Sequence, residues 1–386
     1  MTALRTIPFG RPWITEEDHH AVLSVLQSPV LTHGPQGQQF EAAFQQFLGE
    51  DCYCLTVSSC MAALHLAYLQ MGIGPGDEVV VPAQTHVATV HAVEWVGARP
   101  VFVDCELHTG NLDVTRIEAV VTPRTRAIGL VHFLGMPCAM NEILAIAEHY
   151  GLKVVEDCAI ALGTRYRGRH VGVFGEIGCF SFYPVKHITA GEGGMVVTRN
   201  PQVAERLSRL RAFGVDRSHS ERTRPGQYDV VALGLNYRMS ELQAALGCSQ
   251  LRRIGEILKQ RRMNFFALKS QLAALENVLV LDAPEIDSVN SHYCLSVLLT
   301  GQLARRRDEL VERLKQAGIG TSVYYPQPVP RMAYYRKKYG YAAELYPHAE
   351  ALSNHSIALP VGPHLLPEDI EYIATRFQHA VKEMSL

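Results

Sequence analysis

Short runs of Val, Ile, Leu and Phe alternate with longer amphipathic segments along the first half of the chain. The pattern predicts strands at residues 54–57, 78–83, 99–104, 126–133 and 152–158, and two more near 177–185 and 194–197. Helices are predicted between them, at residues 61–73, 86–97 and 140–151. Buried strands separated by helices are typical of a mainly parallel sheet with helices on both faces. The sequence therefore predicts an α/β fold.

The second half of the chain has a different pattern. From about residue 198 it is mostly helical, most clearly at residues 239–275. Beyond this we predict a strand, a helix, a further extended piece and a last helix, at residues 292–300, 304–318, 320–326 and 367–384. We predict a large domain with a mainly parallel mixed sheet over residues 1–249 and a smaller α+β domain over residues 250–386. No repeat or low-complexity linker interrupts the chain, so the two are expected to pack closely.

Composition narrows the class of protein. Of 386 residues, 47% are hydrophobic and 19% are charged, with a formal net charge of -2, which does not favour nucleic-acid binding. We find no apolar run long enough to cross a membrane and no signal-peptide pattern, so a cytoplasmic protein is expected. The nine cysteines are scattered and form no CxxC pair, so neither a metal site nor a disulfide framework is expected.

Polar residues close several of the apolar runs. Asp157 ends one run, His86 follows another, Ser58 and Ser59 end a third, and Lys186 follows "GCFSFYPV". In open parallel sheets ligands bind beyond the carboxyl ends of the strands. A lysine, a carboxylate, a flat ring and a helix start are the parts that hold pyridoxal phosphate. Each residue alone also fits an ordinary structural role: a solvated loop lysine, a helix-capping aspartate or a hydrogen-bonded structural histidine. Only their joint occurrence indicates a cofactor site.

Longer motifs extend across nearly the whole chain. They include "RPWITEEDHHAVLSVLQS", "GIGPGDEVVVPAQTHVAT", "SFYPVK" followed by "GEGG", and "GLNYRMSELQAALG". With these motifs the chain resembles the DegT/DnrJ/StrS-type aminotransferases, which are sugar aminotransferases of pyridoxal phosphate fold type I. The resemblance implies a large cofactor-binding domain, a smaller C-terminal domain and pyridoxal 5'-phosphate as the cofactor.

The resemblance also assigns roles to single residues. Lys186 is implied to form the Schiff base with the cofactor and to act as the catalytic base and acid. Asp157 is implied to pair with the pyridine nitrogen, His86 to stack on the ring and Ser181 to contact the phosphate. Asn236 is implied to reach the phosphate in the neighbouring subunit, which predicts a homodimer with shared active sites.

Three positions depart from the family pattern. Ser59, Cys60 and Met61 stand where the family usually has Ser-Gly-Thr, so we expect backbone N–H groups to hold the phosphate here. Ile160 occupies a position that is often Gln, and "YYPQPVPRM" lacks a histidine that is common after the tyrosine pair. In the family the Gln lies beside the phenolic oxygen of the cofactor, and the region of the missing histidine lies near the substrate, which leaves open whether the substrate is a typical nucleotide sugar.

We predict that the enzyme transfers an amino group from glutamate to a keto sugar in amino-sugar biosynthesis, by a ping-pong reaction. A nucleotide-linked keto sugar is the expected acceptor, and a free keto sugar or a sugar acid would also fit. Two rival functions stay open at this point. One is a cofactor-dependent sugar dehydratase, in which a histidine replaces the lysine and for which His187 is the candidate. The second is a non-catalytic protein that binds the cofactor for regulation.

Overall fold

The computed structural model describes residues 5–217, 224, 226–283 and 286–385. Its main feature is a seven-stranded sheet with the order β1-β9-β8-β5-β4-β2-β3. Strands β3, β2, β4, β5 and β8 run parallel, and β9 lies antiparallel between β8 and β1. These strands are β1 (Tyr53–Val57), β2 (Glu78–Pro82), β3 (Arg99–Val103), β4 (Thr125–Val131), β5 (Lys153–Asp157), β8 (Ile177–Ser181) and β9 (Gly194–Thr198). The predicted α/β fold with a mainly parallel mixed sheet is confirmed.

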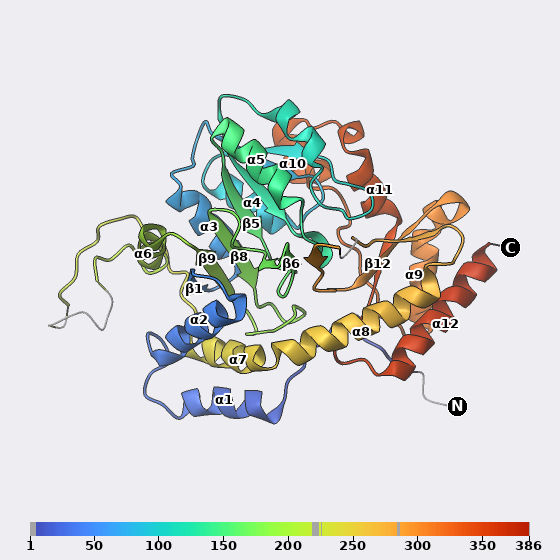
Figure 1. Ribbon diagram of the computed structural model, residues 1–386, viewed down its shortest axis with the longest axis horizontal. Coiled ribbons are helices and arrows are strands. Elements are labelled where there is room, and N and C mark those ends of the chain that lie inside the picture. Colours follow the sequence, from blue (N-terminus) through green and yellow to red (C-terminus); the bar gives the residue numbers. More distant parts are fainter. Residues whose placement is uncertain (1–4, 218–223, 225, 284–285, 386) are drawn as a thin grey trace.

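Successive residues of each strand pack into different layers. On β2, Val79 and Val81 lie in the core that contains α3, whereas Val80 lies in the core beneath α5. This alternation follows from the two-residue period of a strand. Both faces are covered, so the strands read as continuous apolar runs (Figure 1). The helices of this part are α1 (Glu16–Leu26), α2 (Pro35–Leu48), α3 (Cys60–Gln70), α4 (Val87–Trp95), α5 (Met140–Tyr150), α6 (Pro201–Leu210), α7 (Glu241–Arg252), α10 (Ala333–Tyr339) and α11 (Pro347–His355).

A smaller antiparallel sheet, β10-β12-β13, lies in the C-terminal part of the chain. It packs with three helices around a core of its own, and Ile7 from the N-terminal end of the chain joins that core and pairs with Ile319. The elements are β10 (Val278–Val280), β12 (Leu295–Leu299), β13 (Ser356–Leu359), α8 (Ile254–Leu272), α9 (Arg307–Gln316) and α12 (Pro367–Met384). The boundary between residues 249 and 250 stays a prediction.

The remaining elements are short. Three strands form a small sheet that connects the two parts of the chain: β6 (Arg165–Tyr166), β7 (Arg169–His170) and β11 (Ser288–Val289). The 3-10 helices are Val114–Arg116, Glu118–Val120, Phe133–Gly135, Gly301–Arg306, Val329–Arg331 and Ala343–Leu345. In the ranges that the structure describes, no helix is long and apolar enough to cross a membrane.

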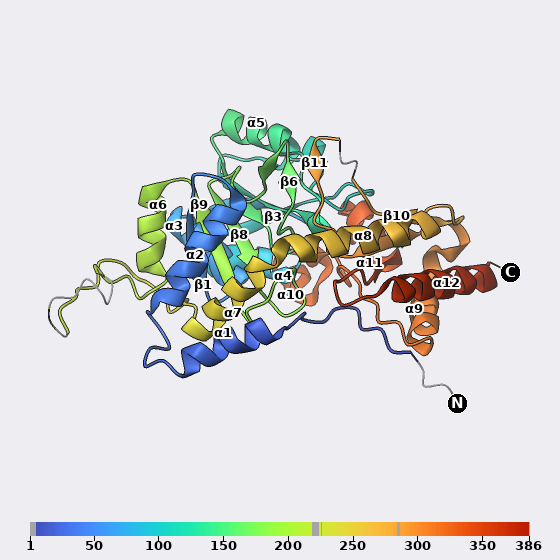
Figure 2. The same cartoon turned by 60° about the horizontal axis from the view of Figure 1, so that its bottom comes forward.

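Helices α7 and α8 follow each other as one long rod beneath the sheet, which Figure 2 shows in gold. Helix α7 packs on α1 and α2, and α8 packs on α12, so the rod joins the two parts. Arg253 stands between the helices and donates to the buried carboxylate of Asp18 at 2.6 Å. The predicted helical stretch at 239–275 is thus confirmed, with an interruption at Arg253.

One expectation for the second half of the chain is wrong, that of a mostly helical chain from residue 198. The described residues between α6 and α7 form an irregular arm that projects from the body, not a helix (Figure 1). Close backbone approaches explain part of this, because a Cβ on Gly234 would lie 2.0 Å from the nitrogen of Gly214. The extended piece at 320–326 forms no strand and makes only a single bridge, between Ser322 and Ala358.

Candidate functional site

The predicted site residues converge at the carboxyl ends of the central strands. Asp157 is the last residue of β5, and Lys186 follows β8, which pairs with β5. Helix α3 begins at Cys60, directly after β1, and the Cys60 thiol lies 3.8 Å from Asp157 Oδ1. His86 begins α4 after β2. The structure therefore brings the lysine, the carboxylate and the helix start together.

Asp157 is buried and held from two sides. The Thr89 hydroxyl donates to Oδ2 at 2.7 Å, and the backbone N–H of Ala159 donates to Oδ1 at 3.0 Å. Thr85 and Thr89 share a further hydrogen bond of 2.8 Å. Neither threonine was predicted as a site residue, although Thr89 lies one helical turn after His86 and so on the same side of α4. These bonds fix the carboxylate, as its predicted pairing with a pyridine nitrogen requires.

Lys186 is a half-buried amine beside an aromatic ring. Its Nζ lies 5.4 Å from the centroid of Tyr293. Among the described residues, none makes a hydrogen bond with this amine. Burial lowers the pKa of Lys186, and the charge of Asp157 opposes this effect only in part. A larger share of the amine is therefore neutral near pH 7, as a nucleophile and proton acceptor requires.

The start of α3 is suited to an anion. The Ser59 hydroxyl accepts a hydrogen bond from the N–H of Ala62 at 3.1 Å, so it caps the helix. In the described structure the N–H groups of Cys60 and Met61 have no acceptor, which leaves them available to a phosphate. Strand β9 presses against this turn, because a Cβ on Gly194 would lie 2.5 Å from the Ser59 carbonyl carbon.

Ser181 lies near the same turn. It ends β8 and pairs with Gly194, which contacts Ser59 and Cys60. Its hydroxyl accepts a hydrogen bond of 3.4 Å from the N–H of Tyr183. This position fits the predicted phosphate contact, which stays a prediction.

His86 is exposed, and its ring is fixed in place. Nδ1 accepts from the N–H of Ala88 at 3.2 Å, and the ring lies 5.5 Å from that of Tyr325 in an edge-on arrangement. Tyr324 and Tyr293, whose hydroxyls are 3.0 Å apart, continue an aromatic wall around Lys186. No role was predicted for Tyr324 and Tyr325, whose segment stood out in the sequence only for a missing histidine.

Asn236 lies at the end of the arm. Its side chain is exposed and accepts a hydrogen bond of 3.1 Å from Arg238. The carbonyl of Tyr237 accepts from the N–H of Ser58 at 2.8 Å, so the end of the arm is joined to the turn before α3. The position is compatible with a phosphate contact, and whether that contact is made across subunits stays a prediction.

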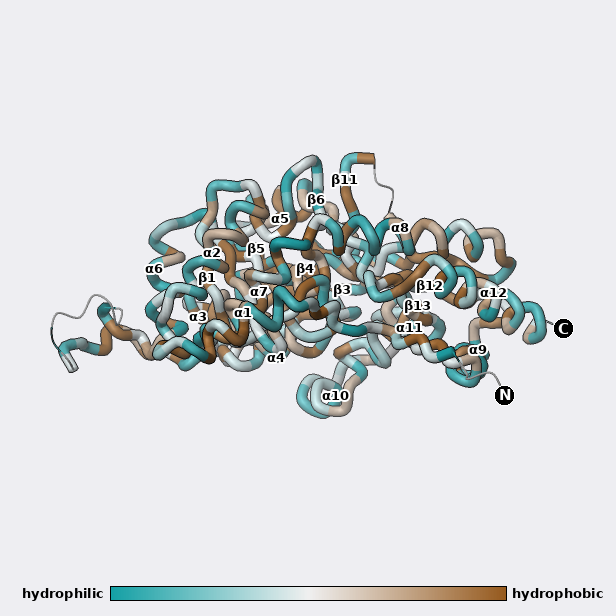
Figure 3. The backbone as a smooth tube through the Cα atoms, turned by 90° about the horizontal axis from the view of Figure 1, so that it is seen from below, coloured by the Kyte–Doolittle hydropathy of each residue, from teal (hydrophilic) through white to brown (hydrophobic). Residues whose placement is uncertain are grey.

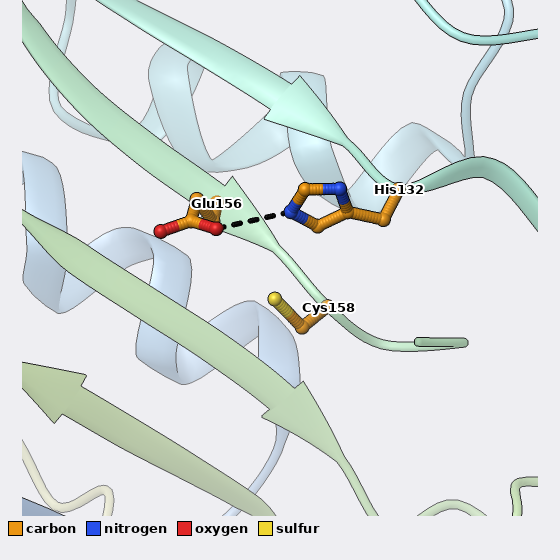
Figure 4. A group of neighbouring side chains, drawn as sticks. All are labelled: His132, Glu156 and Cys158. Carbon is orange, nitrogen blue, oxygen red and sulfur yellow. Dashed lines mark hydrogen bonds and ion pairs between the residues drawn. The ribbon is translucent and has the colours of Figure 1, made fainter. Parts of the chain in front are cut away.

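His132, Glu156 and Cys158 form a buried group (Figure 4). Two of its members, Glu156 and Cys158, flank Asp157 in the sequence. Glu156 accepts from His132 Nε2 at 3.0 Å and from the N–H groups of Gly172, Phe174 and Gly175 at 2.6–2.8 Å. Burial alone would raise the pKa of Glu156, but the bond and charge of His132 and the backbone N–H groups outweigh it and lower this pKa. The Glu156 carboxylate is thus already saturated, and it fastens the turn that leads into β8.

The set of donors fits pyridoxal phosphate. Its aldehyde requires an amine, and its ring nitrogen a fixed carboxylate. Its ring face requires a flat side chain, and its phosphate free N–H groups at a helix start. The site offers all four of these groups. Fold and site together define a pyridoxal-phosphate-dependent aminotransferase of fold type I.

Comparison with known proteins gives the family. Residues 12–378 match the model of the DegT/DnrJ/EryC1/StrS aminotransferase family, and the chain belongs to it. The chain is 36% identical over 383 residues to the spore coat polysaccharide biosynthesis protein SpsC of Bacillus subtilis, covering 97% of each protein. The predicted family, cofactor and aminotransferase activity are confirmed.

Solved structures show the same architecture. The chain is similar to the putative sugar aminotransferase Spr1654 of Streptococcus pneumoniae, in its PMP form, with a TM-score of 0.92, 27% identity and coverage of 98% of this chain and 100% of that one. It is also similar to DesV of S. venezuelae in complex with a ketimine intermediate, with a TM-score of 0.88, 34% identity and coverage of 97% of this chain and 99% of that one.

His187 is the residue that a dehydratase would use in place of the lysine. It is buried, and its Nε2 is hydrogen-bonded to the carbonyl of Ser291.

We expect Thr89→Val to lower turnover by about tenfold, because it removes one hydrogen bond that fixes the Asp157 carboxylate, at a cost of about 1.5 kcal/mol.

Asp157→Asn is expected to retain the cofactor and to lose far more activity than Thr89→Val, because an amide cannot hold the ring nitrogen in its protonated state. Cofactor content and turnover check both variants, with Thr115→Val as the exposed control. Near-normal turnover in Asp157→Asn would show that the ring nitrogen is paired elsewhere.

Glu156→Gln is expected to lower the free energy of unfolding at pH 7 by about 2–3 kcal/mol, because its amide turns an N–H donor toward backbone donors. The lowered folded-state pKa of Glu156 contributes stability above its unfolded pKa, and this is lost as the pH falls through the folded pKa. The deficit of the variant should therefore shrink in acid. Urea unfolding at pH 7 and at an acidic pH measures the free energy of unfolding of the wild type and the variant. The partly exposed Glu176→Gln is the control. An equal loss of unfolding free energy at both pH values would contradict the stabilising role of the ionised Glu156 carboxylate.

Proposed function

We propose that this sugar aminotransferase takes its amino group from glutamate and delivers it to a nucleotide-linked keto sugar, working as a cytoplasmic homodimer with shared active sites. The observation that carries the catalytic part is the half-buried Lys186 amine, which has no acceptor among the described residues and lies close to Asp157. Pyridoxal phosphate, when bound, supplies the electron sink for the reacting carbon. The name of SpsC supports a role in polysaccharide biosynthesis.

The residues around the site divide the remaining tasks. Lys186 would hold the cofactor through its amine, and the freed amine would accept the proton of the substrate carbon and return it. Its lowered pKa keeps part of the amine neutral for this step. Asp157 holds the positive end of the ring, and the N–H groups of Cys60 and Met61, with Ser181, bind the phosphate. The rings of His86 and Tyr325 are in contact with each other. Together they would limit the movement of the cofactor ring.

The arm supports the homodimer. Val230, Val231 and Leu233 are exposed on it, Leu233 by 91%. Part of the described arm is coloured as hydrophobic where it projects from the body in Figure 3. An apolar projection of this kind is stabilised when a second surface covers it. A second copy is the proposed occupant, because the arm ends at Asn236, beside the turn that begins the anion site.

Lys186 is expected to hold the cofactor, and glutamate is expected to convert it. The purified enzyme should be yellow, glutamate should bleach it, and reduction with borohydride should mark the peptide that contains Lys186. Lys186→Ala should neither bleach nor give a marked peptide, whereas Lys153→Ala, a surface control, should behave as the wild type. A marked peptide with another lysine would reject the assignment, and a yellow enzyme that glutamate leaves yellow would reject the donor.

Asn236 is expected to act across the dimer interface. Subunits of Asn236→Ala and of the inactive Lys186→Ala are mixed and allowed to exchange. If Asn236 serves the partner's site, the mixed dimer has one site with both lesions and one intact site, so activity should rise above both parents. If Asn236 serves its own chain, every site keeps a lesion. Absence of recovery after proven exchange, with Asn236→Ala clearly impaired, would therefore reject shared sites.

A further inference from the structure

The thiol of Cys60 lies inside the candidate site and is directed at its carboxylate. Cys60 is the first residue of α3, and its side chain is buried in the core that this helix forms with the sheet. The Sγ atom lies 3.8 Å from Asp157 Oδ1, within the range of a hydrogen bond that a thiol donates. The side chain of Cys60 therefore contacts Asp157, in addition to the free backbone N–H group of the same residue at the helix start.

Asp157 thus accepts hydrogen bonds from three places in the chain. Thr89 on α4 donates to Oδ2 at 2.7 Å, and the N–H of Ala159, two residues further along, donates to Oδ1 at 3.0 Å. The Cys60 thiol is the donor that comes from α3. An ionised carboxylate offers about four lone-pair sites, so three donors leave room for one more hydrogen bond. This is the number that pairing with a single ring nitrogen requires.

The surroundings keep the thiol in the protonated form, which can donate. Burial raises the pKa of Cys60 well above its ordinary value, and the charge of Asp157 raises it further. The charge of Lys186 acts in the opposite direction and is outweighed. Near pH 7 Cys60 is therefore a neutral S–H group, a hydrogen-bond donor and not a nucleophile.

Cys179 provides a comparison within the same core. It is the strand partner of Asp157 in the pairing of β8 with β5, and its side chain is fully buried. Among the described residues its thiol makes no hydrogen bond with Asp157. A buried thiol beside this carboxylate is thus not bonded to it merely because it is near, and the contact of Cys60 depends on the position of its side chain at the start of α3.

We propose that Cys60 is a positioning residue, whose thiol ties Asp157 to the start of α3 and so fixes the carboxylate relative to the anion site. The backbone N–H of the same residue belongs to the free donors of that helix start, so one residue borders both anchors of the cofactor. The ring nitrogen and the phosphate of a bound cofactor are a fixed distance apart, so their two anchors must keep a matching separation. The proposal rests on the proposed function only in that Asp157 pairs with the ring nitrogen.

The S–H stretching band tests the hydrogen bond without reference to activity. The infrared spectrum of the full chain with its cofactor, minus that of Cys60→Ser, isolates the band of this thiol, and Cys179→Ser isolates a reference band. The same differences are taken in an Asp157→Asn background. A neutral amide accepts a weaker hydrogen bond than a carboxylate, so the Cys60 band should move to higher frequency while the Cys179 band stays. An unmoved Cys60 band, or an equal movement of both bands, would overturn the proposal.

Two substitutions of nearly equal volume separate the donor from the space that it fills. Cys60→Ala is expected to lower the saturating rate at which the amino donor bleaches the yellow enzyme by about threefold to tenfold, the effect of losing one hydrogen bond to a charged group. The donor concentration at half-maximal rate should not change, because Asp157 is proposed to act on the cofactor and not on the donor. Cys60→Ser keeps a hydroxyl donor and should recover part of the rate. Cys179→Ala is the matched control and should react as the wild type.

The same rates show which idea has failed. Equal losses in Cys60→Ala and Cys60→Ser would mean that the thiol only fills space, and wild-type rates in both would also reject its role. Near-normal bleaching of Asp157→Asn would reject the pairing with the ring nitrogen and, with it, the role of Cys60. Severe loss in Asp157→Asn without any effect of Cys60→Ala would retain the pairing and reject only the role of Cys60. Any amino acid that bleaches the enzyme serves in this test, so the result does not depend on glutamate.

Discussion

Two neighbouring carboxylates on β5 have different surroundings, and much of the active site depends on this arrangement. The pleat of a strand turns successive side chains to opposite faces. Asp157 lies among Thr89, Cys60 and Lys186, and Glu156 lies with His132 among the backbone N–H groups of the following turn. One carboxylate thereby lies where the proposed cofactor contact requires it, and the other fixes the turn that leads into β8, which the Lys186 segment follows.

This arrangement explains why tight packing is needed around the turn. A Cβ on Gly178 would lie 2.2 Å from the carbonyl oxygen of Gly172, so only glycine allows β8 to approach the turn that Glu156 holds. Since β8 pairs with β5 at Asp157 and Cys179, the distance between the carboxylate and the lysine segment is set by backbone contacts. Backbone contacts within the sheet, and not flexible side chains, thus set the relative positions of the carboxylate and the lysine segment.

The sequence predicted the central sheet well because its strands are buried on both faces and appear as long apolar runs. The lysine and carboxylate were recognisable for the same reason, since each closes such a run. The arm was missed because glycines and distant contacts, not periodicity, determine its path. Thr89 was missed because its partner Asp157 is remote in sequence, so local pattern gives no indication that Thr89 faces the site.

The positions of Asp157 and Lys186 also bear on how one site can handle two different substrates. Asp157 is buried at the end of β5 and held by the Thr89 hydroxyl and the N–H of Ala159, so its carboxylate has a fixed position whatever substrate is present. Lys186 lies beside the Tyr293 ring on a segment that is set by the pairing of β8 with β5. The groups proposed to act on the cofactor therefore keep one geometry for the amino acid and for the sugar, because backbone contacts of the sheet and not contacts to substrate determine it.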